Sequence, residues 1–110
     1  MGAALSGAAV GTKCGLSYYV YILASQAYGT LYIGMTSDLV QRIWEHKSKA
    51  VPGFTARYGV DQLVWFETHA TAEAAILRMQ QIKEWKRGWK FNLIERENPH
   101  WVDLYPGICN

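Results

Sequence analysis

Two tyrosines, an arginine and a histidine that follow one another closely in the sequence could carry out chemistry together. These residues are Tyr21, Tyr32, Arg42 and His46. A tyrosine with a pKa near 10 is a poor base unless its phenolate is stabilised, and a neighbouring cation such as Arg42 can supply that stabilisation. The chemistry of this chain therefore depends on whether the fold brings the four side chains together.

The two tyrosines lie in segments that predict a β-hairpin. Residues 18–24 are rich in aromatic and β-branched side chains, which favours a strand. Residues 25–30 contain small polar residues and a glycine and predict a connection, and residues 31–34 predict the second strand, so the pair is expected to be antiparallel. Gly34 has no Cβ and would let a neighbouring group approach its backbone closely.

A helix is expected directly after the hairpin, from residue 38 to about residue 49. Thr36 or Ser37 can cap its first turn. Because Arg42 and His46 are four residues apart, their side chains lie on the same flank of that helix. Its candidate apolar face consists of Leu39, Val40, Ile43 and Trp44.

The rest of the chain predicts one strand and two helices after a loop. We expect the loop at residues 51–60, a central or well-covered strand at 62–68, and helices at 72–85 and 89–97. Thr71 can cap the first of these helices, and Gly88 is expected to mark a break between them. The candidate core residues of the two helices are Ala75, Ile76, Leu77, Met79, Ile82, Phe91, Leu93 and Ile94. Residues 100–105 are expected to pack Trp101 and Leu104 back onto the domain.

These segments predict a compact α/β (α+β) domain, in which a small three-stranded antiparallel sheet is flanked by about three helices. The 110 residues suit a single domain with its own core. We expect a flexible leader at residues 1–16, the domain at residues 17–105 and a short tail at residues 106–110.

The composition excludes some classes of protein. Half of the residues are hydrophobic, which argues against disorder, and the net charge of +2 permits a nucleic-acid partner without demanding one. No apolar run reaches the length of a membrane span, and no basic segment marks a signal peptide, so we expect a cytoplasmic protein without a membrane partner. Cys14 and Cys109 lack the spacing of a zinc site; a disulfide between them is open, but two free thiols are favoured.

The order of these residues resembles the GIY-YIG nuclease superfamily. Tyr19-Val20-Tyr21 matches the first half of its signature, with tyrosine in place of the leading glycine, and Tyr32-Ile33-Gly34 matches the second half. Arg42, His46 and the tail sequence NPHWVDLY follow in the expected order. The resemblance covers residues 17–105 and is to the small, single-domain bacterial branch. It implies an endonuclease that hydrolyses DNA phosphodiester bonds with Mg²⁺ or Mn²⁺, on DNA that is branched or flapped.

The resemblance also implies roles for individual residues. Tyr32 or Tyr21 would be the base or its partner, and Arg42 would hold the phosphate in a two-pronged contact. His46 would assist proton transfer or orient a tyrosine. The secondary candidates for contacts with the nucleic-acid backbone are Lys47 and Arg57.

The chain departs from the family pattern at the metal ligand. Related small proteins carry Arg-Glu-x-Gln-Ile-Lys on the first of the two later helices, and Met79 stands here where that glutamate would be. A thioether is a soft, neutral ligand, whereas magnesium prefers hard oxygen ligands. We therefore assign no metal-binding residue. The chain either has lost cleavage and kept binding, or recruits another carboxylate or a metal bound to the substrate.

A basic segment at residues 83–90, KEWKRGWK, contains Trp85 and Trp89. Its cations could follow a phosphate backbone while bases stack on the indoles, and Lys83 and Arg87 are the candidate contacts. The interpretation we favour is that both tryptophans pack inward. Two other functions stay open for the whole chain: a nucleic-acid-binding module without cleavage, and a protein-interaction domain with a protein partner on its aromatic-rich surface.

Overall fold

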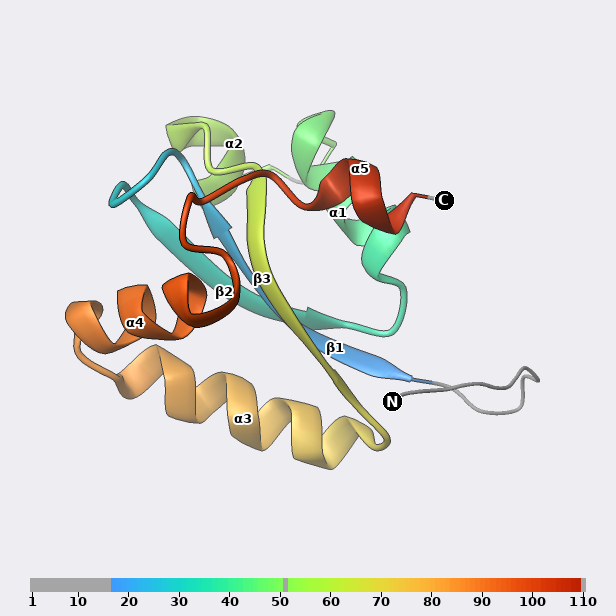
Figure 1. Ribbon diagram of the computed structural model, residues 1–110. Helices are drawn as coiled ribbons and strands as arrows, with labels where there is room; N and C mark the ends of the chain where they lie inside the picture. Colours follow the sequence, from blue (N-terminus) through green and yellow to red (C-terminus); the bar gives the residue numbers. More distant parts are fainter. Residues whose placement is uncertain (1–16, 51, 110) are drawn as a thin grey trace.

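The computed structural model describes residues 17–50 and 52–109, so the predicted leader at 1–16 lies outside the described residues. The elements are β1 (Tyr18–Ala24), β2 (Leu31–Thr36), α1 (Leu39–Lys47), α2 (Phe54–Tyr58), β3 (Gln62–His69), α3 (Ala72–Glu84), α4 (Arg87–Glu97) and α5 (Tyr105–Ile108) (Figure 1). The predicted α+β class with a three-stranded antiparallel sheet is confirmed. Two short helices, α2 and α5, add to the three that were predicted.

The strand order is β2-β1-β3, and both pairings are antiparallel. The central strand is β1, whose residues from Val20 to Ala24 are all buried. Residues 62–68 were expected to form a central or well-covered strand, and the second alternative is confirmed. Strand β3 lies at an edge of the sheet, but Leu63, Val64 and Trp65 are buried, with Leu63 in one core cluster and the other two in the other.

Successive side chains of β1 point into two separate cores, as the period of a strand requires. Val20 and Ile22 pack in a cluster that also contains residues of α3 and α4. Tyr21 and Leu23 pack in a second cluster with Leu39 and Ile43 of α1, partly closed by residues of α5. Figure 1 shows α3 and α4 together on one side of the sheet and α1 and α2 on the other.

The first turn of α1 begins one residue later than predicted. Asp38 is the N-cap, and its side chain accepts a hydrogen bond from the backbone N–H of Gln41 at 3.2 Å, so the cap is not Thr36 or Ser37. Half of the predicted apolar face is also wrong. Leu39 and Ile43 are buried, but Val40 and Trp44 are exposed, because residues four apart form the one narrow strip that meets the sheet.

Residues Phe54–Tyr58, predicted as loop, form one helical turn. Gly53 precedes the turn with φ at 114°, and Gly59 ends it with φ at 65°. Both angles lie in the region that glycine adopts without steric cost, so these two glycines allow a tight entry and exit. The consequence is that Thr55 points inward and is buried.

Thr71 caps α3 as predicted, since its hydroxyl oxygen accepts from the backbone N–H of Ala74 at 3.1 Å. Of the predicted core residues in α3 and α4, Ile76 and Leu77 are exposed, and the others are buried or packed against the core. Gly88 does not break the chain; it lies in the first turn of α4, and the break falls at Trp85 and Lys86, whose backbones are extended.

The C-terminal segment folds back as predicted, and Trp101 and Leu104 pack against the two cores. The buried side chain of Asn98 holds this segment in place by hydrogen bonds. Its amide donates to the carbonyl oxygens of Val64 at 3.0 Å and Val102 at 2.8 Å, and its oxygen accepts from the N–H of Val102 at 3.0 Å. Packing continues beyond residue 105, because Ile108 of α5 lies against the α1 cluster.

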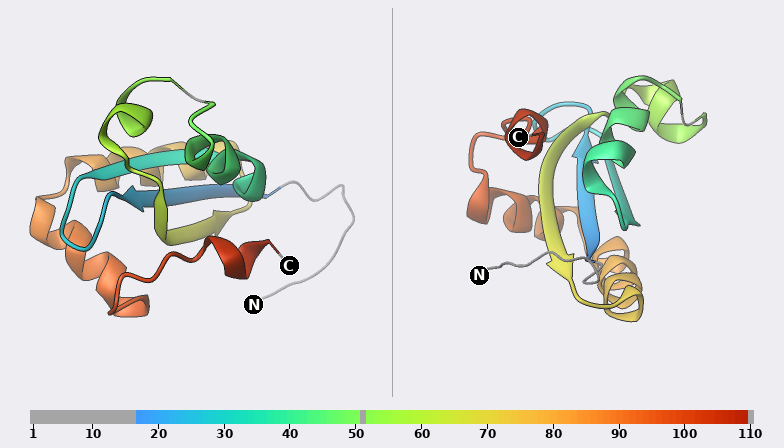
Figure 2. Two further views of the ribbon diagram at one scale, coloured as in Figure 1. Left: turned by 90° about the horizontal axis from the view of Figure 1, so that it is seen from above. Right: turned by 90° about the vertical axis from the view of Figure 1, so that its right-hand side faces the viewer.

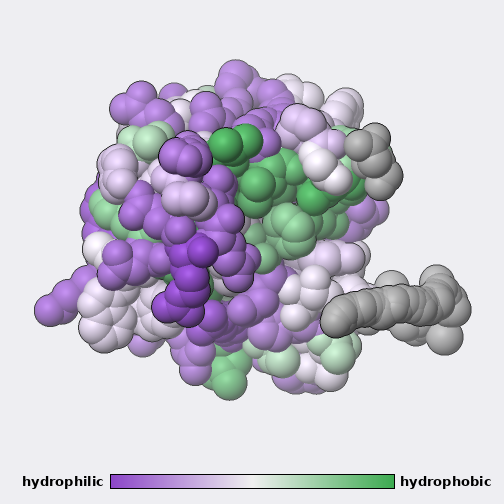
Figure 3. Space-filling model, viewed as in Figure 1, coloured by the Kyte–Doolittle hydropathy of each residue, from purple (hydrophilic) through white to green (hydrophobic). Residues whose placement is uncertain are grey.

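The surface shown in Figure 3 is uneven. Apolar residues gather around α5, whereas hydrophilic residues dominate over α4. The views in Figure 2 place α5 and α4 in one C-terminal stretch that runs along the β3 edge of the sheet. Among the described residues, no helix has both the length and the apolar character needed to cross a membrane.

Candidate active site

The predicted site is built on the hairpin. Tyr21 of β1 lies opposite Gly34 of β2, and Tyr32 precedes Gly34 by two residues, so all three share one face of the sheet. A Cβ on Gly34 would lie 2.6 Å from the Tyr21 hydroxyl oxygen and 3.0 Å from Cε2 of Tyr32. Gly34 is therefore required for space, because both aromatic rings occupy the volume that a side chain would need.

A buried chain of hydrogen-bonding groups crosses from the sheet to the helices. The Tyr21 hydroxyl oxygen is 3.1 Å from Nε2 of His46, and Nδ1 of His46 is 2.9 Å from Oγ1 of Thr55. The exposed fractions of Tyr21, His46 and Thr55 are 2%, 3% and 4%. Thr55 was not among the predicted site residues, because residues 51–60 were expected to form a loop.

The two nitrogen atoms of His46 can divide the donor and acceptor roles in two ways. With the ring proton on Nδ1, His46 donates to Thr55 and accepts from the Tyr21 hydroxyl at Nε2. In that tautomer the Tyr21 hydroxyl proton points at a base, which is the arrangement needed for the phenol to pass a proton onward.

The protonation states of this pair are shifted by their surroundings. Burial, reinforced by the nearby Tyr32, raises the pKa of Tyr21 well above its ordinary value, and the positive charge of Arg42 opposes that rise only in part. Burial lowers the pKa of His46, and Arg42 lowers it further. Tyr21 is therefore a neutral phenol and His46 a neutral imidazole at pH 7, so His46 is the member of the pair able to accept a proton.

Tyr32 joins the same group of rings. Its ring centroid is 5.5 Å from that of His46 and 6.3 Å from that of Tyr21. Unlike Tyr21, it is only partly buried, which leaves it accessible from the surface. Among the described residues, no hydrogen-bond partner lies within reach of its hydroxyl, so that group is available for a ligand.

Arg42 lies one turn before His46 on α1, and its side chain is 40% exposed. One guanidinium nitrogen is 3.4 Å from a carboxylate oxygen of Glu45. An exposed ion pair of this kind is worth little, so exchanging Glu45 for an incoming phosphate costs little. The structure therefore brings together all four predicted residues, with the cation at the accessible edge and the Tyr21–His46 pair inside.

The two secondary candidates beside the site differ from one another. The ammonium of Lys47 donates to the carbonyl oxygen of Asp61 at 2.9 Å and to a carboxylate oxygen of Asp103 at 2.5 Å. Lys47 thus joins α1 to the C-terminal segment. Arg57 is exposed on α2, 5.6 Å from the ring of Tyr58, and its guanidinium is accessible. Of the two, Arg57 is placed to contact a ligand.

Lys83 and Arg87 lie at the end of α3 and the start of α4, and the structure does not bring them together with Tyr21 and His46. Lys83 is exposed. Arg87 donates to the carbonyl oxygens of Tyr28 at 2.8 Å and Gly29 at 2.5 Å, so it holds the β1–β2 connection against α4. Any contact that these two cations make with nucleic acid is therefore remote from the tyrosines.

The residues present do not fit a divalent metal held by the protein. Met79 lies on α3 and packs against the cluster on the α3–α4 face, whereas Tyr21 belongs to the cluster on the other face. Within residues 17–50 and 52–109, no three side chains of His, Cys, Asp or Glu gather as a ligand set. Glu45, the carboxylate beside the site, already pairs with Arg42.

Several known proteins resemble this chain in sequence. The family profile described as the GIY-YIG catalytic domain matches residues 17–92. A UPF0213 protein of Haloquadratum walsbyi is 36% identical over 78 residues, which cover 71% of this chain and 86% of that protein. A UPF0213 protein of Bacillus pumilus is 33% identical over 79 residues, 72% of this chain and 80% of that protein. The solution NMR structure of a UPF0213 protein from Bacillus halodurans, 29% identical, covers 74% of this chain and 86% of its own, with a TM-score of 0.48.

Proposed function

Because this chain belongs to the GIY-YIG family, we propose that it is an endonuclease that hydrolyses DNA phosphodiester bonds at the site formed by Tyr21, His46 and Arg42. One observation carries the proposal: a buried, hydrogen-bonded pair of neutral proton-transfer groups lies beside an accessible guanidinium. Burying a phenol and an imidazole is costly unless each is hydrogen-bonded, and the packing of a core does not call for either group. The arrangement does match the needs of phosphoryl transfer.

Arg42 would bind the scissile phosphate. Its planar guanidinium can donate two parallel hydrogen bonds to two phosphate oxygens, which fixes the orientation of the phosphorus and offsets the charge that develops on those oxygens. The accessible hydroxyl of Tyr32 and the guanidinium of Arg57 would then meet the substrate from β2 and from α2.

Tyr21 would act as a relay rather than as a pre-formed phenolate, because burial raises its pKa. A water molecule gives a proton to the Tyr21 oxygen while Tyr21 gives its own proton to Nε2 of His46. The resulting hydroxide attacks phosphorus, the bond from phosphorus to the leaving oxygen breaks, and that oxygen takes a proton from solvent. His46 then passes its proton back to Tyr21 while Tyr21 releases to solvent the proton that it took from water, which restores both groups. Thr55 accepts from Nδ1 of His46 throughout.

Nucleases of this family generally use a divalent metal. If this chain cleaves, we propose that Mg²⁺ or Mn²⁺ is brought by the substrate, because the described residues offer no ligand set. Met79 and the lack of a ligand set among the described residues favour a second candidate function, a nucleic-acid-binding module that does not cleave. The two candidates share the phosphate contact of Arg42 and differ only in whether the phosphodiester bond is broken. In either case we propose that the chain acts in the cytoplasm on DNA with branches or flaps.

A cleavage assay with Mg²⁺ or Mn²⁺ on flapped, branched and plain duplex DNA separates these functions. We expect the parent to cut and Arg42→Ala to bind weakly and not cut. If only Met79→Glu cuts, the parent is a binding module with an otherwise complete site. If the parent neither binds nor cuts any of these DNAs at low salt, both candidate functions fail and the protein-interaction alternative gains support.

A further inference from the structure

A polar cleft lies between α3 and α4, away from the tyrosines. Its volume is about 360 Å³, within the range of pockets that hold small ligands. It is lined by Arg78, Trp85, Trp89, Asn92, Leu93 and Arg96. Helices α3 and α4 pack against one core cluster, whereas Tyr21 belongs to the other. The proposed active site therefore does not use this cleft.

The two indoles form one end of the cleft. The ring centroids of Trp85 and Trp89 are 6.1 Å apart, with an interplanar angle of 70°. Trp89 is 59% exposed, which overturns the expectation that both tryptophans pack inward; Trp85 alone is partly buried. Exposing a large apolar ring to water is unfavourable, so a ligand that covers the face of Trp89 would bind with the help of that burial.

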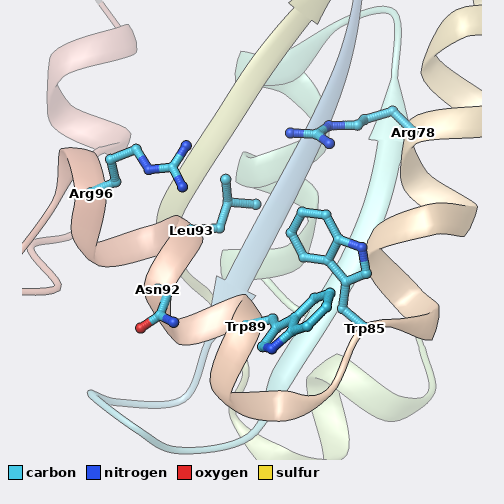
Figure 4. Close-up of a pocket in the computed structure, with 6 residues that line it drawn as sticks. All are labelled: Arg78, Trp85, Trp89, Asn92, Leu93 and Arg96. Carbon is cyan, nitrogen blue, oxygen red and sulfur yellow. The ribbon is translucent and has the colours of Figure 1, made fainter.

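Two arginines face each other across the same cleft. Figure 4 shows the guanidinium groups of Arg78 and Arg96 projecting from α3 and α4 toward one another, with Leu93 between them. Arg78 is held by both carboxylate oxygens of Glu67, at 3.0 and 3.4 Å, and lies 5.4 Å from the Trp85 ring. Arg96 is exposed, and no acidic partner lies within ion-pair distance of it among the described residues. Arg78 therefore supports the indole, and Arg96 is available for an anion.

The positive charge of the chain is concentrated in the segment that contains the residues of this cleft. Residues 78–96 contain six lysines and arginines and two glutamates. The rest of the chain contains five lysines and arginines and seven aspartates and glutamates. This short segment is thus net +4 in a chain whose net charge is +2, and the remainder is net −2. An anionic polymer would be attracted to the α3–α4 face in preference to the rest of the molecule.

We propose that this cleft binds an unpaired nucleotide of a single-stranded nucleic acid, with its base stacked on Trp89 and its phosphate held by Arg96. A nucleotide carries a flat ring and an anionic group within one short unit, and the cleft offers a matching indole and guanidinium. An acidic peptide would complement the guanidinium but leave the indole face uncovered. The proposal goes beyond the endonuclease function, because binding here requires no cleavage.

Fluorescence anisotropy of a labelled ten-residue oligothymidylate, measured over a range of salt concentrations, tests this site. We expect Trp89→Ala to weaken binding roughly tenfold, as expected for the loss of one stacked base. Arg96→Gln should reduce the slope of log affinity against log salt by about 0.7, the value for one phosphate contact on a single strand. Trp44→Ala is the matched control, since Trp44 is a similarly exposed tryptophan on α1. We expect it to bind as the parent does.

Several outcomes would overturn the proposal. Trp89→Ala and Arg96→Gln could both bind like the parent, or Trp44→Ala could lose as much affinity as Trp89→Ala. Blunt duplex or poly-glutamate could displace the oligonucleotide as well as unlabelled single strand does. That result would mean that the surface binds any polyanion and does not recognise an unpaired nucleotide. Competition by free thymidine monophosphate at equal concentration of nucleotide would show a site for a mononucleotide rather than a strand. Tyr21→Phe is expected to bind the oligonucleotide normally, so failure of the endonuclease proposal is distinguishable from failure of this one.

Discussion

At the scale of single residues, the site depends on the close packing of the Tyr21 and Tyr32 rings against the backbone of Gly34. Both rings occupy the space beside the Gly34 backbone, and the Tyr21 hydroxyl is held there by His46. Because the pair is buried, small changes in volume or charge have nowhere to relax. Two predictions follow from this crowding and from the shifted pKa values.

Gly34→Ala is expected to displace both tyrosines, since the new Cβ would lie 2.6 Å from the Tyr21 hydroxyl oxygen. Overpacking of this kind costs about 1–3 kcal/mol in the free energy of unfolding, and cleavage should be lost with it. Chemical denaturation and the cleavage assay measure the two effects. Gly88→Ala is the control: a Cβ there meets nothing within 4 Å, and a helical alanine should raise stability by up to about 1 kcal/mol. Equal effects of the two substitutions would rule out the steric explanation.

The stability of the protein should fall in mild acid because of His46. The pKa of His46 is lowered by burial and by Arg42, so between that lowered pKa and the ordinary value of 6.5 the unfolded chain binds more protons than the folded chain. The contribution is fully present above pH 6.5 and is lost as the pH falls through this window. Thermal unfolding at several pH values should show a smaller loss of stability in His46→Gln than in the parent.

His100→Gln provides the comparison for that titration, because His100 is exposed on the C-terminal segment. We expect it to keep the pH dependence of the parent. If His46→Gln and the parent lose stability equally between pH 7.5 and pH 5.5, the burial of a neutral imidazole at position 46 is not the cause of the acid sensitivity.

At the scale of elements, the site depends on two short parts of the chain, helix α2 and the C-terminal segment. The single turn of α2 presents Thr55 to His46, and the C-terminal segment is held to β3 by Asn98 and Asp103. One carboxylate oxygen of Asp103 accepts from the backbone N–H of Leu63 at 3.1 Å, and the other accepts from Lys47. Helix α1 and the end of the chain are thereby tied to the same edge strand.

Asn98→Ala should therefore loosen the C-terminal segment. The substitution removes three hydrogen bonds and leaves the carbonyl oxygen of Val64 without that partner. We expect the free energy of unfolding to fall by about 2–3 kcal/mol, which urea denaturation can measure. His100→Ala, a change at an exposed neighbour, should stay within about 0.5 kcal/mol of the parent. A loss below about 0.5 kcal/mol for Asn98→Ala would mean that the segment is held by its apolar contacts instead.

At the scale of the whole molecule, the sheet separates the two faces to which we assign the proposed functions. One face carries the Tyr21–His46 pair against α1 and α2, and the other carries α3, α4 and most of the positive charge. If DNA is bound by both faces, a branched or flapped substrate suits the molecule better than a straight duplex, because two of its arms can reach opposite sides of the domain.

Local patterns in the sequence predicted most of this architecture. The aromatic and β-branched run of β1 and the apolar spacing of α3 each had one physical interpretation, so the sheet and the long helices were placed correctly. The order of the strands was not predictable in the same way, because buried edges and buried centres both produce apolar runs such as that of β3.

The site was predicted in part. The spacing of Arg42 and His46 on a helix was enough to place them on one flank, and the hairpin placed the two tyrosines. Thr55 was missed as a partner of His46, because nothing in a segment with two flanking glycines shows that it forms a helical turn. The exposure of Trp89 was also missed, since a tryptophan near lysines is compatible with a core or a surface position, and only the packing of α3 against α4 decides between them.

The most direct test of the central claim is single-turnover cleavage of a flapped DNA by the parent, Tyr21→Phe and Tyr19→Phe. Tyr19 lies on the same strand and the same face as Tyr21 but contributes no hydrogen bond to His46 among the described contacts. If Tyr21 relays a proton to His46, Tyr21→Phe binds the DNA and does not cut it, while Tyr19→Phe cuts at a rate close to that of the parent. Cleavage by Tyr21→Phe at the parent's rate would contradict the account.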